Sequence, residues 1–426
     1  MPIYENFYIG QSKSKSDQRG FDNLVNMDVF TDIGHAQCQL ALVSESATPN
    51  EDCISASVTN GDVFFFSTES GKIWKRTAAG VYSLVHTNTN GSHAGAMLFD
   101  GILYYSTAAD LGKQTEALAS SEASWSSETD DFAAYDNDNA NKPMAVVGSG
   151  LYIGDGNLVA FVDTSGTFTS DGVDLPLEET ITALTGSGID LLIGTQVGTN
   201  ISTCNVYLWD RVSVAWTLQD PLPENGVNCF IPADNLIIAQ AGKNGQLYYW
   251  TGQKMEKLKK IRGVSTVVAP YNSAMLNGRS LFATGAKVFA IHREDRDFPY
   301  AVVQEYTATT GSITSLSSAN SQLQVATGAN IDKIGTDYAT ATIDTPESED
   351  AKQKTVVKYD SIGSGGVIGI ATKIDDAGSF TAKTVITSTI KKKAFNDGGE
   401  GTANFKQSRI TLTPSGANNI VIKSIE

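Results

Sequence analysis

Four histidines are the residues of this chain whose side chains could bind a metal ion. His35, His86, His93 and His292 lie far apart in the sequence, and only His86 and His93 are near each other. The spacings HxH and HExxH, and the Cys/His spacings of zinc sites, are all missing. We therefore interpret all four as ordinary surface or loop histidines.

Aspartates are the second group with chemical potential, because two carboxyl groups that flank a sugar can hydrolyse a glycosidic bond. Asp155, Asp163, Asp190 and Asp210 lie at expected strand ends or turns. Asp caps its own backbone in turns, and this alone explains the four positions. The sequence predicts no catalytic residue and indicates that the protein is not an enzyme.

An acidic loop at residues 129–141, TDDFAAYDNDNAN, could offer oxygen ligands to calcium. The DxDxDG frame of calcium loops fails, because Ala140 and Asn141 occupy its fifth and sixth places. A solvated acidic loop is the preferred interpretation, with calcium as the alternative, and we predict neither a metal nor a cofactor. The loop's aspartates are Asp130, Asp131, Asp136 and Asp138.

The composition narrows the possible partners and the cellular setting. The net charge of −16 would repel nucleic acid over most of the chain, so we predict no nucleic-acid binding. The start of the sequence lacks the apolar run of a signal peptide, and no window approaches the roughly 18 apolar residues of a membrane helix. We expect a chain made in the cytoplasm without membrane insertion. The cysteines lack a CxxC pair, and we expect them to be reduced, buried and apolar in role: Cys38, Cys53, Cys204 and Cys229.

One apolar phrase occurs seven times, at intervals of 39 to 49 residues. Several copies are followed by a hairpin pattern, an apolar strand, a polar turn and another strand, and most are preceded by a short apolar run. Each repeat therefore holds about four strands. The phrases are VFFFST from residue 63, ILYYST from 102, LYIGDG from 151, LLIGTQ from 191, LIIAQA from 236, LFATGA from 281 and LQVATGA from 323.

Four strands in each 40 to 45 residues indicate the blades of a β-propeller. The phrase would be the second strand of each blade, with small residues where neighbouring blades crowd together. We predict an all-β protein with seven blades, six being the alternative. The N-terminal run CQLALVSES could add a strand to the last blade and close the ring.

The repeat pattern ends near residue 346, where the polar sequence TPESEDAKQKT is typical of a linker. We predict an N-terminal arm at 1–34, a propeller at 35–345 and a small C-terminal β-sandwich at 346–426. The sandwich holds 11 Lys and Arg against 9 Asp and Glu, a net charge of +2. The net charge of the whole chain is −16, so residues 1–345 carry −18. The polar arm would order on a partner.

Two basic segments and the tryptophans are further candidates for contacts. The segments 254–263 and 389–393 could be exposed outer strands whose lysines prevent edge pairing, or docking patches for an acidic neighbour. Exposed tryptophans could stack on a glycan, but blade packing is expected for all except Trp125. The tryptophans considered are Trp125, Trp209, Trp216 and Trp250.

The opening FYIGQSKSKSDQRG, the following NMDVFTDIGHAQCQLALVSES, the phrases LYIGDGNLVAFVD and LLIGT, and the C-terminal β-domain resemble propeller-bearing structural proteins of tailed bacteriophages. The resemblance implies a virion component, in the tail or another exposed place, that is assembled in the host cytoplasm and contributes to host adsorption. It implies docking to other virion proteins through the arm and the sandwich, in a homo- or hetero-oligomeric assembly, and contact with a host surface glycan. The alternative is a soluble lectin-like or glycan-processing propeller.

Overall fold

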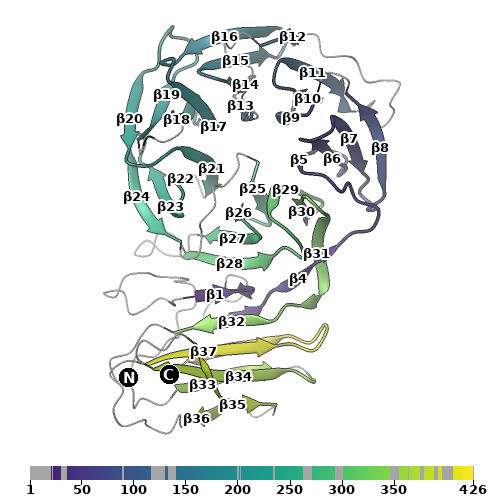
Figure 1. The fold of residues 1–426 in the computed structure, drawn as a ribbon, viewed down its shortest axis with the longest axis vertical. Coiled ribbons are helices and arrows are strands. Elements are labelled where there is room, and N and C mark those ends of the chain that lie inside the picture. The colour runs from purple at the N-terminus through teal and green to yellow at the C-terminus, as the bar shows by residue number, and fades with distance from the viewer. Residues whose placement is uncertain are drawn as a thin grey trace. The chain divides into compact units, whose positions relative to one another are not determined.

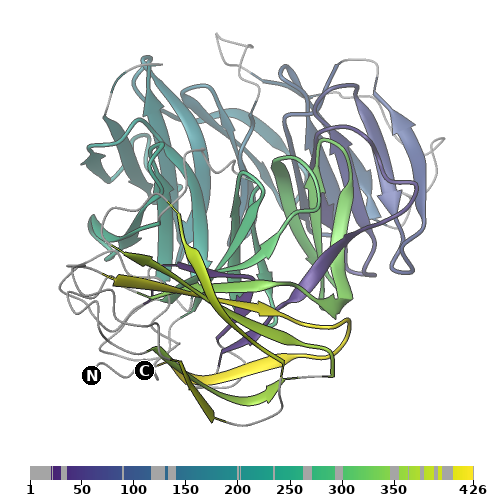
Figure 2. The same ribbon diagram turned by 60° about the horizontal axis from the view of Figure 1, so that its bottom comes forward.

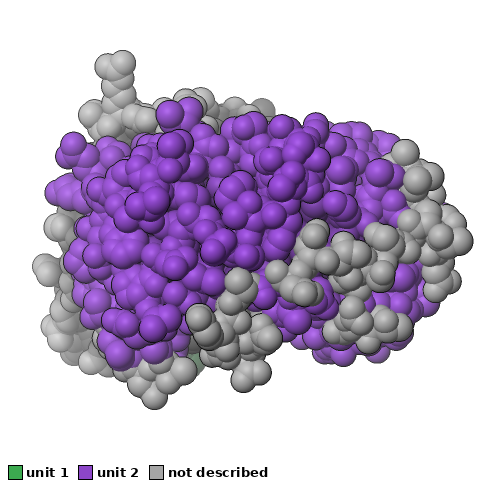
Figure 3. All heavy atoms as spheres, turned by 90° about the horizontal axis from the view of Figure 1, so that it is seen from above, with its two compact units in different colours: residues 1–43, 287–307, 334–426 green, residues 44–286, 308–333 purple. Residues whose placement is uncertain are grey.

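The structure, a computed structural model, describes residues 21, 23–29, 36–88, 91–116, 130–132, 141–198, 201, 203–233, 236–261, 271–292, 301–345, 355–362, 364–374, 379–387, 392–395 and 406–425. These residues form β-strands and turns, and none of them belongs to a helix long and apolar enough to cross a membrane. The all-β prediction is confirmed. The chain divides into two compact units, which we call the ring unit (residues 44–286 and 308–333) and the terminal unit (residues 1–43, 287–307 and 334–426). Figure 3 shows the ring unit in purple.

Sheets of four antiparallel strands make up most of the ring unit, arranged around a centre in the manner of a β-propeller (Figure 1). Five of the described four-stranded sheets use strands that follow one another in the sequence, as the repeat pattern predicted. The first two sheets contain β5 (Cys53–Ser57), β6 (Val63–Ser67), β7 (Lys72–Arg76) and β8 (Tyr82–Thr87), then β9 (Gly95–Phe99), β10 (Ile102–Ser106), β11 (Asp110–Thr115) and β12 (Asp130–Asp131). The next contains β13 (Met144–Val147), β14 (Gly150–Asp155), β15 (Leu158–Asp163) and β16 (Phe168–Asp174).

The remaining sheets of the ring unit continue this order. They contain β17 (Glu179–Ser187), β18 (Asp190–Val197), β19 (Cys204–Trp209) and β20 (Leu218–Leu222), then β21 (Val227–Ala233), β22 (Leu236–Ala241), β23 (Gln246–Trp250) and β24 (Met255–Lys260). β25 (Ser273–Leu276) pairs with β26 (Arg279–Thr284), and β29 (Ile313–Ala319) pairs with β30 (Gln322–Thr327), which pairs with β31 (Ile331–Tyr338). The seven apolar phrases form β6, β10, β14, β18, β22, β26 and β30, so their prediction as second strands is confirmed.

Small residues in the phrases lie where neighbouring sheets approach closely. A Cβ atom on Gly154 would lie 2.7 Å from Ile181 Cγ2 of the next sheet. A Cβ atom on Gly194 would lie 2.6 Å from Val227 Cγ1, again across the boundary between two sheets. Both distances are far inside van der Waals contact, so these glycines permit the sheets to pack.

The N-terminal run CQLALVSES does supply a strand beside β31. β4 (Leu40–Ser44) is the last strand of the sheet β29-β30-β31-β4. In the ring unit the backbone N–H of Glu45 donates to the carbonyl of Ile331 at 2.9 Å, and Ser44 Oγ donates to Asp332 at 2.9 Å. The predicted closing strand is therefore confirmed.

The terminal unit consists of two sheets that share one apolar core, and Figure 2 brings its yellow and olive strands forward. One sheet runs β27 (Lys287–His292), β28 (Ala301–Thr307), β1 (Asn23–Val25), β32 (Ala341–Asp344), β37 (Lys406–Thr413), β34 (Val367–Ile374) and β35 (Thr381–Ile386). The other runs β2 (Met27–Asp28), β3 (Ala36–Cys38), β38 (Ile420–Ile425), β33 (Thr355–Ile362) and β36 (Lys392–Phe395).

This unit differs from the boundaries at residues 34 and 345 that the sequence suggested. Phe21, Leu24 and Met27 lie inside the segment interpreted as a polar arm, yet they are fully buried in the core with Ile410 and Ile422. β1 pairs in parallel with β28 and antiparallel with β32, so the described part of the arm is an integral part of the unit. The physical reason is that these short apolar stretches bury their side chains only against strands from distant parts of the chain.

Candidate functional site

A cavity of about 530 Å³ lies at the centre of the ring unit. Residues of β5, β9, β13, β17, β21, β25 and β29 line it, so the first strand of each repeat faces the same space. The lining side chains are small, hydroxyl-bearing or apolar, and none of the described residues that line the cavity is charged. The size is in the range of small-molecule sites, which span roughly 300–1,000 Å³.

A fully buried ion pair lies close to this cavity. Lys142 Nζ is bonded to the Asp155 carboxylate, and neither side chain has exposed surface. Lys142 Nζ also lies 4.7 Å from the centroid of the Phe132 ring, a cation–π contact. The carbonyl of Lys142 accepts a hydrogen bond from Tyr271, which lines the cavity.

The interpretation of Asp155 as a turn residue was wrong. It ends β14 as expected, but its carboxylate pairs with a lysine that precedes the neighbouring strand β13. For two other aspartates the turn interpretation is confirmed: Asp163 accepts from the backbone N–H groups of Ser165 and Thr167, and Asp210 from those of Val212 and Ser213. Asp190 opens β18.

Glu45 joins the closing strand to the first repeat. Its carboxylate accepts from Arg76 Nε at 2.6 Å and Nη2 at 2.8 Å, from the Tyr82 hydroxyl at 2.6 Å, and pairs with Lys333 Nζ at 3.0 Å. Burial raises the pKa of Glu45, but the hydrogen bonds from Arg76, Tyr82 and Lys333 outweigh it and lower the pKa to about 2. The Glu45 carboxylate therefore has a structural role. Its partners lie far away in the sequence, so no local pattern could predict the cluster.

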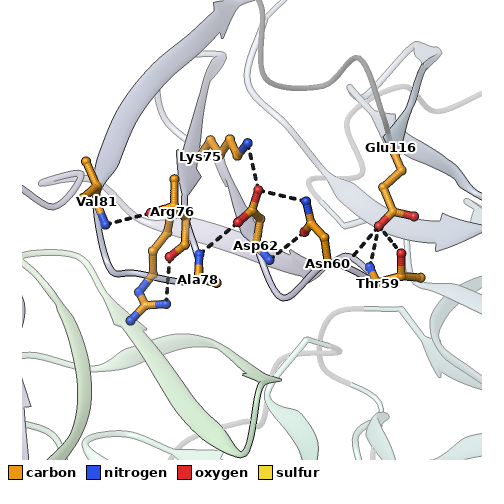
Figure 4. Close-up of polar contacts among 9 residues, drawn as sticks. Thr59, Asn60, Asp62, Lys75, Arg76, Ala78, Val81 and Glu116 are labelled. Carbon is orange, nitrogen blue, oxygen red and sulfur yellow. Dashed lines mark hydrogen bonds and ion pairs between the residues drawn. The ribbon is translucent and has the colours of Figure 1, made fainter.

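Two further carboxylates hold turns of the first repeat in place, as Figure 4 shows. Asp62 pairs with Lys75 at 2.8 Å and accepts from the N–H of Ala78 at 2.9 Å. Glu116 accepts from the N–H groups of Thr59 and Asn60, at 2.6 and 3.3 Å. Both carboxylate oxygens of Asp62 and one of Glu116 thus accept from or pair with groups of the first repeat, which is the arrangement of structural carboxylates.

The structure describes the side chains of two histidines, His86 and His93. His93 is buried between Phe66 and Tyr105, which corrects its interpretation as a surface residue, although it does lie in the loop before β9. His86 is half-buried in β8, the backbone of His292 belongs to β27, and His35 lies outside the described residues. No group of three His, Cys, Asp or Glu among the described residues could hold a metal ion.

Other expectations from the sequence have mixed outcomes. The four cysteines are free and buried, as predicted. Trp209 and Trp250 are buried and Trp216 packs against Tyr207, also as predicted. Residues 255–260 of the basic segment 254–263 form β24, the outer strand of its sheet. Trp125, Asp136, Asp138 and Lys391 lie outside the described residues, and only the backbone is described for Asp130, Asp131, Lys392 and Lys393.

Comparison with known proteins identifies the fold alone. No protein-family model matches the chain, and no curated protein sequence matches it. A streptogramin B lyase structure is similar at a TM-score of 0.52 and 13% identity, over 69% of this chain and 97% of that one. Virginiamycin B lyase from Staphylococcus aureus is similar at a TM-score of 0.52 and 11% identity, over 69% of this chain and 98% of that one. A chain of the mitotic checkpoint complex is similar at a TM-score of 0.51 and 10% identity, over 76% of this chain and 95% of that one. The chain thus has a β-propeller fold.

Proposed function

We propose that this chain is a non-catalytic structural and attachment component of a bacteriophage particle, built as a seven-bladed propeller with a β-sandwich. The convergence of seven first strands on one cavity supports seven blades. Two sheets around one core in the terminal unit support the sandwich. The phage assignment itself rests on the resemblance of the domain order and the N-terminal sequence to propeller-bearing structural proteins of tailed bacteriophages.

An exposed apolar surface on the ring unit carries the assembly role. Ile189, Val212 and Val214 are 75%, 89% and 97% exposed. Arg211 Nε donates to the carbonyl of Ile189, which ties their two turns together, and the carboxylate of Asp210 caps the turn that holds the valines. Apolar side chains held in solvent by hydrogen-bonded turns favour a protein partner, because burying each would stabilise the complex by about 1.5–3 kcal/mol.

The test replaces surface residues and leaves the chain ends intact. Deleting residues 1–34 would remove Leu24 and Met27 from a core, so truncation would report on folding and not on docking. We expect Val212→Asp with Val214→Asp to lower incorporation into particles at least about tenfold, measured by quantitative mass spectrometry of purified phage. Leu177→Asp is the matched control, since Leu177 is 79% exposed at the opposite end of β17 from Ile189.

Unchanged incorporation of the double variant would refute this surface as the docking site. Particles that never contain the chain would refute the virion role itself. A second candidate function, a lectin-like propeller, is favoured by the uncharged central cavity, where the side chains of Ser55, Ser57 and Ser317 all carry hydroxyls.

A further inference from the structure

Another pocket of the ring unit, of about 1080 Å³, lies among the sheets that contain β17, β21 and β25. These sheets are neighbours in the ring (Figure 1). The turns that follow β17, β23 and β25 border the pocket, and apolar side chains supply most of the rest of its lining. We call it the turn pocket, and its large side chains are those of Leu236, Ile237, Tyr249, Trp250 and Met275.

The polar side chains of the turn pocket already have partners within the protein. Trp250 Nε1 donates to Ser187 Oγ at 3.2 Å, and Thr251 Oγ1 donates at 2.9 Å to a backbone carbonyl of its own turn. The Tyr249 hydroxyl donates to the carboxylate of Glu256, which does not line the pocket. None of the described residues that line the pocket is charged. A bound group would therefore gain free energy mainly by burying apolar surface.

The turn pocket is continuous with the docking surface formed by Ile189, Val212 and Val214. Gly188 lines the pocket, and Ile189, the next residue, is 75% exposed. The backbone carbonyl of Ile189 accepts a hydrogen bond from Arg211, which precedes the two exposed valines. A small molecule bound in the pocket would leave these apolar side chains in water, whereas a protein partner would cover both the pocket and the side chains beside it.

The lining of the turn pocket favours an aromatic ring as the group that enters it. An added Cβ atom on Gly188, Gly252 or Gly278 would meet no atom within 4 Å, so the bordering turns leave open space beside them. The thioether of Met275 and the ring of Tyr249 both make favourable contacts with aromatic rings. We propose that the turn pocket receives an aromatic side chain of the protein that covers the docking surface.

This proposal rests on the docking surface of the proposed function, so its first test needs no particle. On the purified chain the probes are toluene, p-cresol and indole, which reproduce aromatic side chains, with n-butylammonium and propionate as charged analogues. The ¹⁵N-labelled indole N–H of Trp250 reports binding by NMR, because this group lies in the pocket bonded to Ser187. We expect the aromatic probes to shift the Trp250 signal until it saturates, and the charged analogues to leave it unchanged.

Substitution of Met275 connects the pocket to the protein partner. Met275 is 45% exposed, so Met275→Glu places a charge in the pocket wall without disturbing a buried core. It should weaken probe binding and incorporation into particles about tenfold each, since one apolar wall is lost. Leu84→Glu is the matched control, because Leu84 is also 45% exposed but does not line the pocket, and it should change neither measurement.

The outcomes separate the pocket from the docking surface. The proposal is overturned if no aromatic probe shifts the Trp250 signal or if the charged analogues shift it equally. Probe binding with normal incorporation of Met275→Glu would also overturn it and indicate a small-molecule site, while the Val212→Asp and Val214→Asp variant still decides the docking surface.

Two further results concern the identity of the partner. Self-association of the purified chain that Met275→Glu abolishes, measured by sedimentation velocity, would assign the pocket to a second copy of the chain and overturn the proposal. Particles that never contain the chain would refute the virion role, and the probes alone would then uphold or overturn the aromatic site.

Discussion

Replacing Lys142 with methionine tests how the ring unit is held together at its third sheet. Lys142 and Asp155 form an ion pair with no exposed surface on either side chain, and the ammonium also faces the Phe132 ring. Methionine has a similar length and no charge, so Lys142→Met leaves the Asp155 carboxylate buried without its cation. Removing one partner of a buried pair costs about 3–5 kcal/mol, and we expect the free energy of unfolding to fall by about 4 kcal/mol.

Urea unfolding followed by tryptophan fluorescence and circular dichroism measures this loss. The double variant Lys142→Met with Asp155→Leu should recover most of the stability, because an apolar pair of similar volume replaces a buried ion pair at little cost. Lys254→Met is the control, since Lys254 and Glu256 form an exposed pair, and it should have no measurable effect. A single variant as stable as wild type, or a double variant no better than the single, would show that the pair is not the dominant interaction at this position.

Three further predictions concern titration and thiol chemistry. The pKa of Glu45 is about 2 in the fold, so the wild type should lose about 2 kcal/mol of stability as the pH falls from 4.5 towards 2, after allowance for solvent screening. In urea titrations Glu45→Gln should be less stable than the wild type near neutral pH and should lack this acid dependence. Burial lowers the pKa of His93 to about 4, so stability that is full above pH 6.5 should fall by about 3 kcal/mol by pH 4, and His93→Leu should abolish that loss. Burial raises the pKa of every cysteine thiol, so a chromogenic disulfide reagent should react with the four only after unfolding, and fast reaction in native buffer would contradict their buried state.

Repeats and turns were the features that could be predicted most fully. LYIGDG and LLIGTQ occupy second strands because their apolar pattern suits a strand buried between two neighbouring sheets, and this requirement recurs in every repeat. Asp163 and Asp210 were predictable because an aspartate that caps its own turn needs only residues within a few positions. The boundaries of the two compact units were not predictable in this way, since Leu24 and Met27 are recognisable as core residues only beside strands hundreds of residues later.

By itself, the sequence determined the all-β class and the strand order within each repeat, because these depend on side-chain pattern over a few residues. Tertiary structure decided which polar groups meet. Asp155 pairs with Lys142, which precedes the neighbouring strand β13, and Glu45 pairs with Arg76 where the closing strand meets the first repeat. Such pairs have no local sequence signal, because they form only when separate strands or separate repeats pack together.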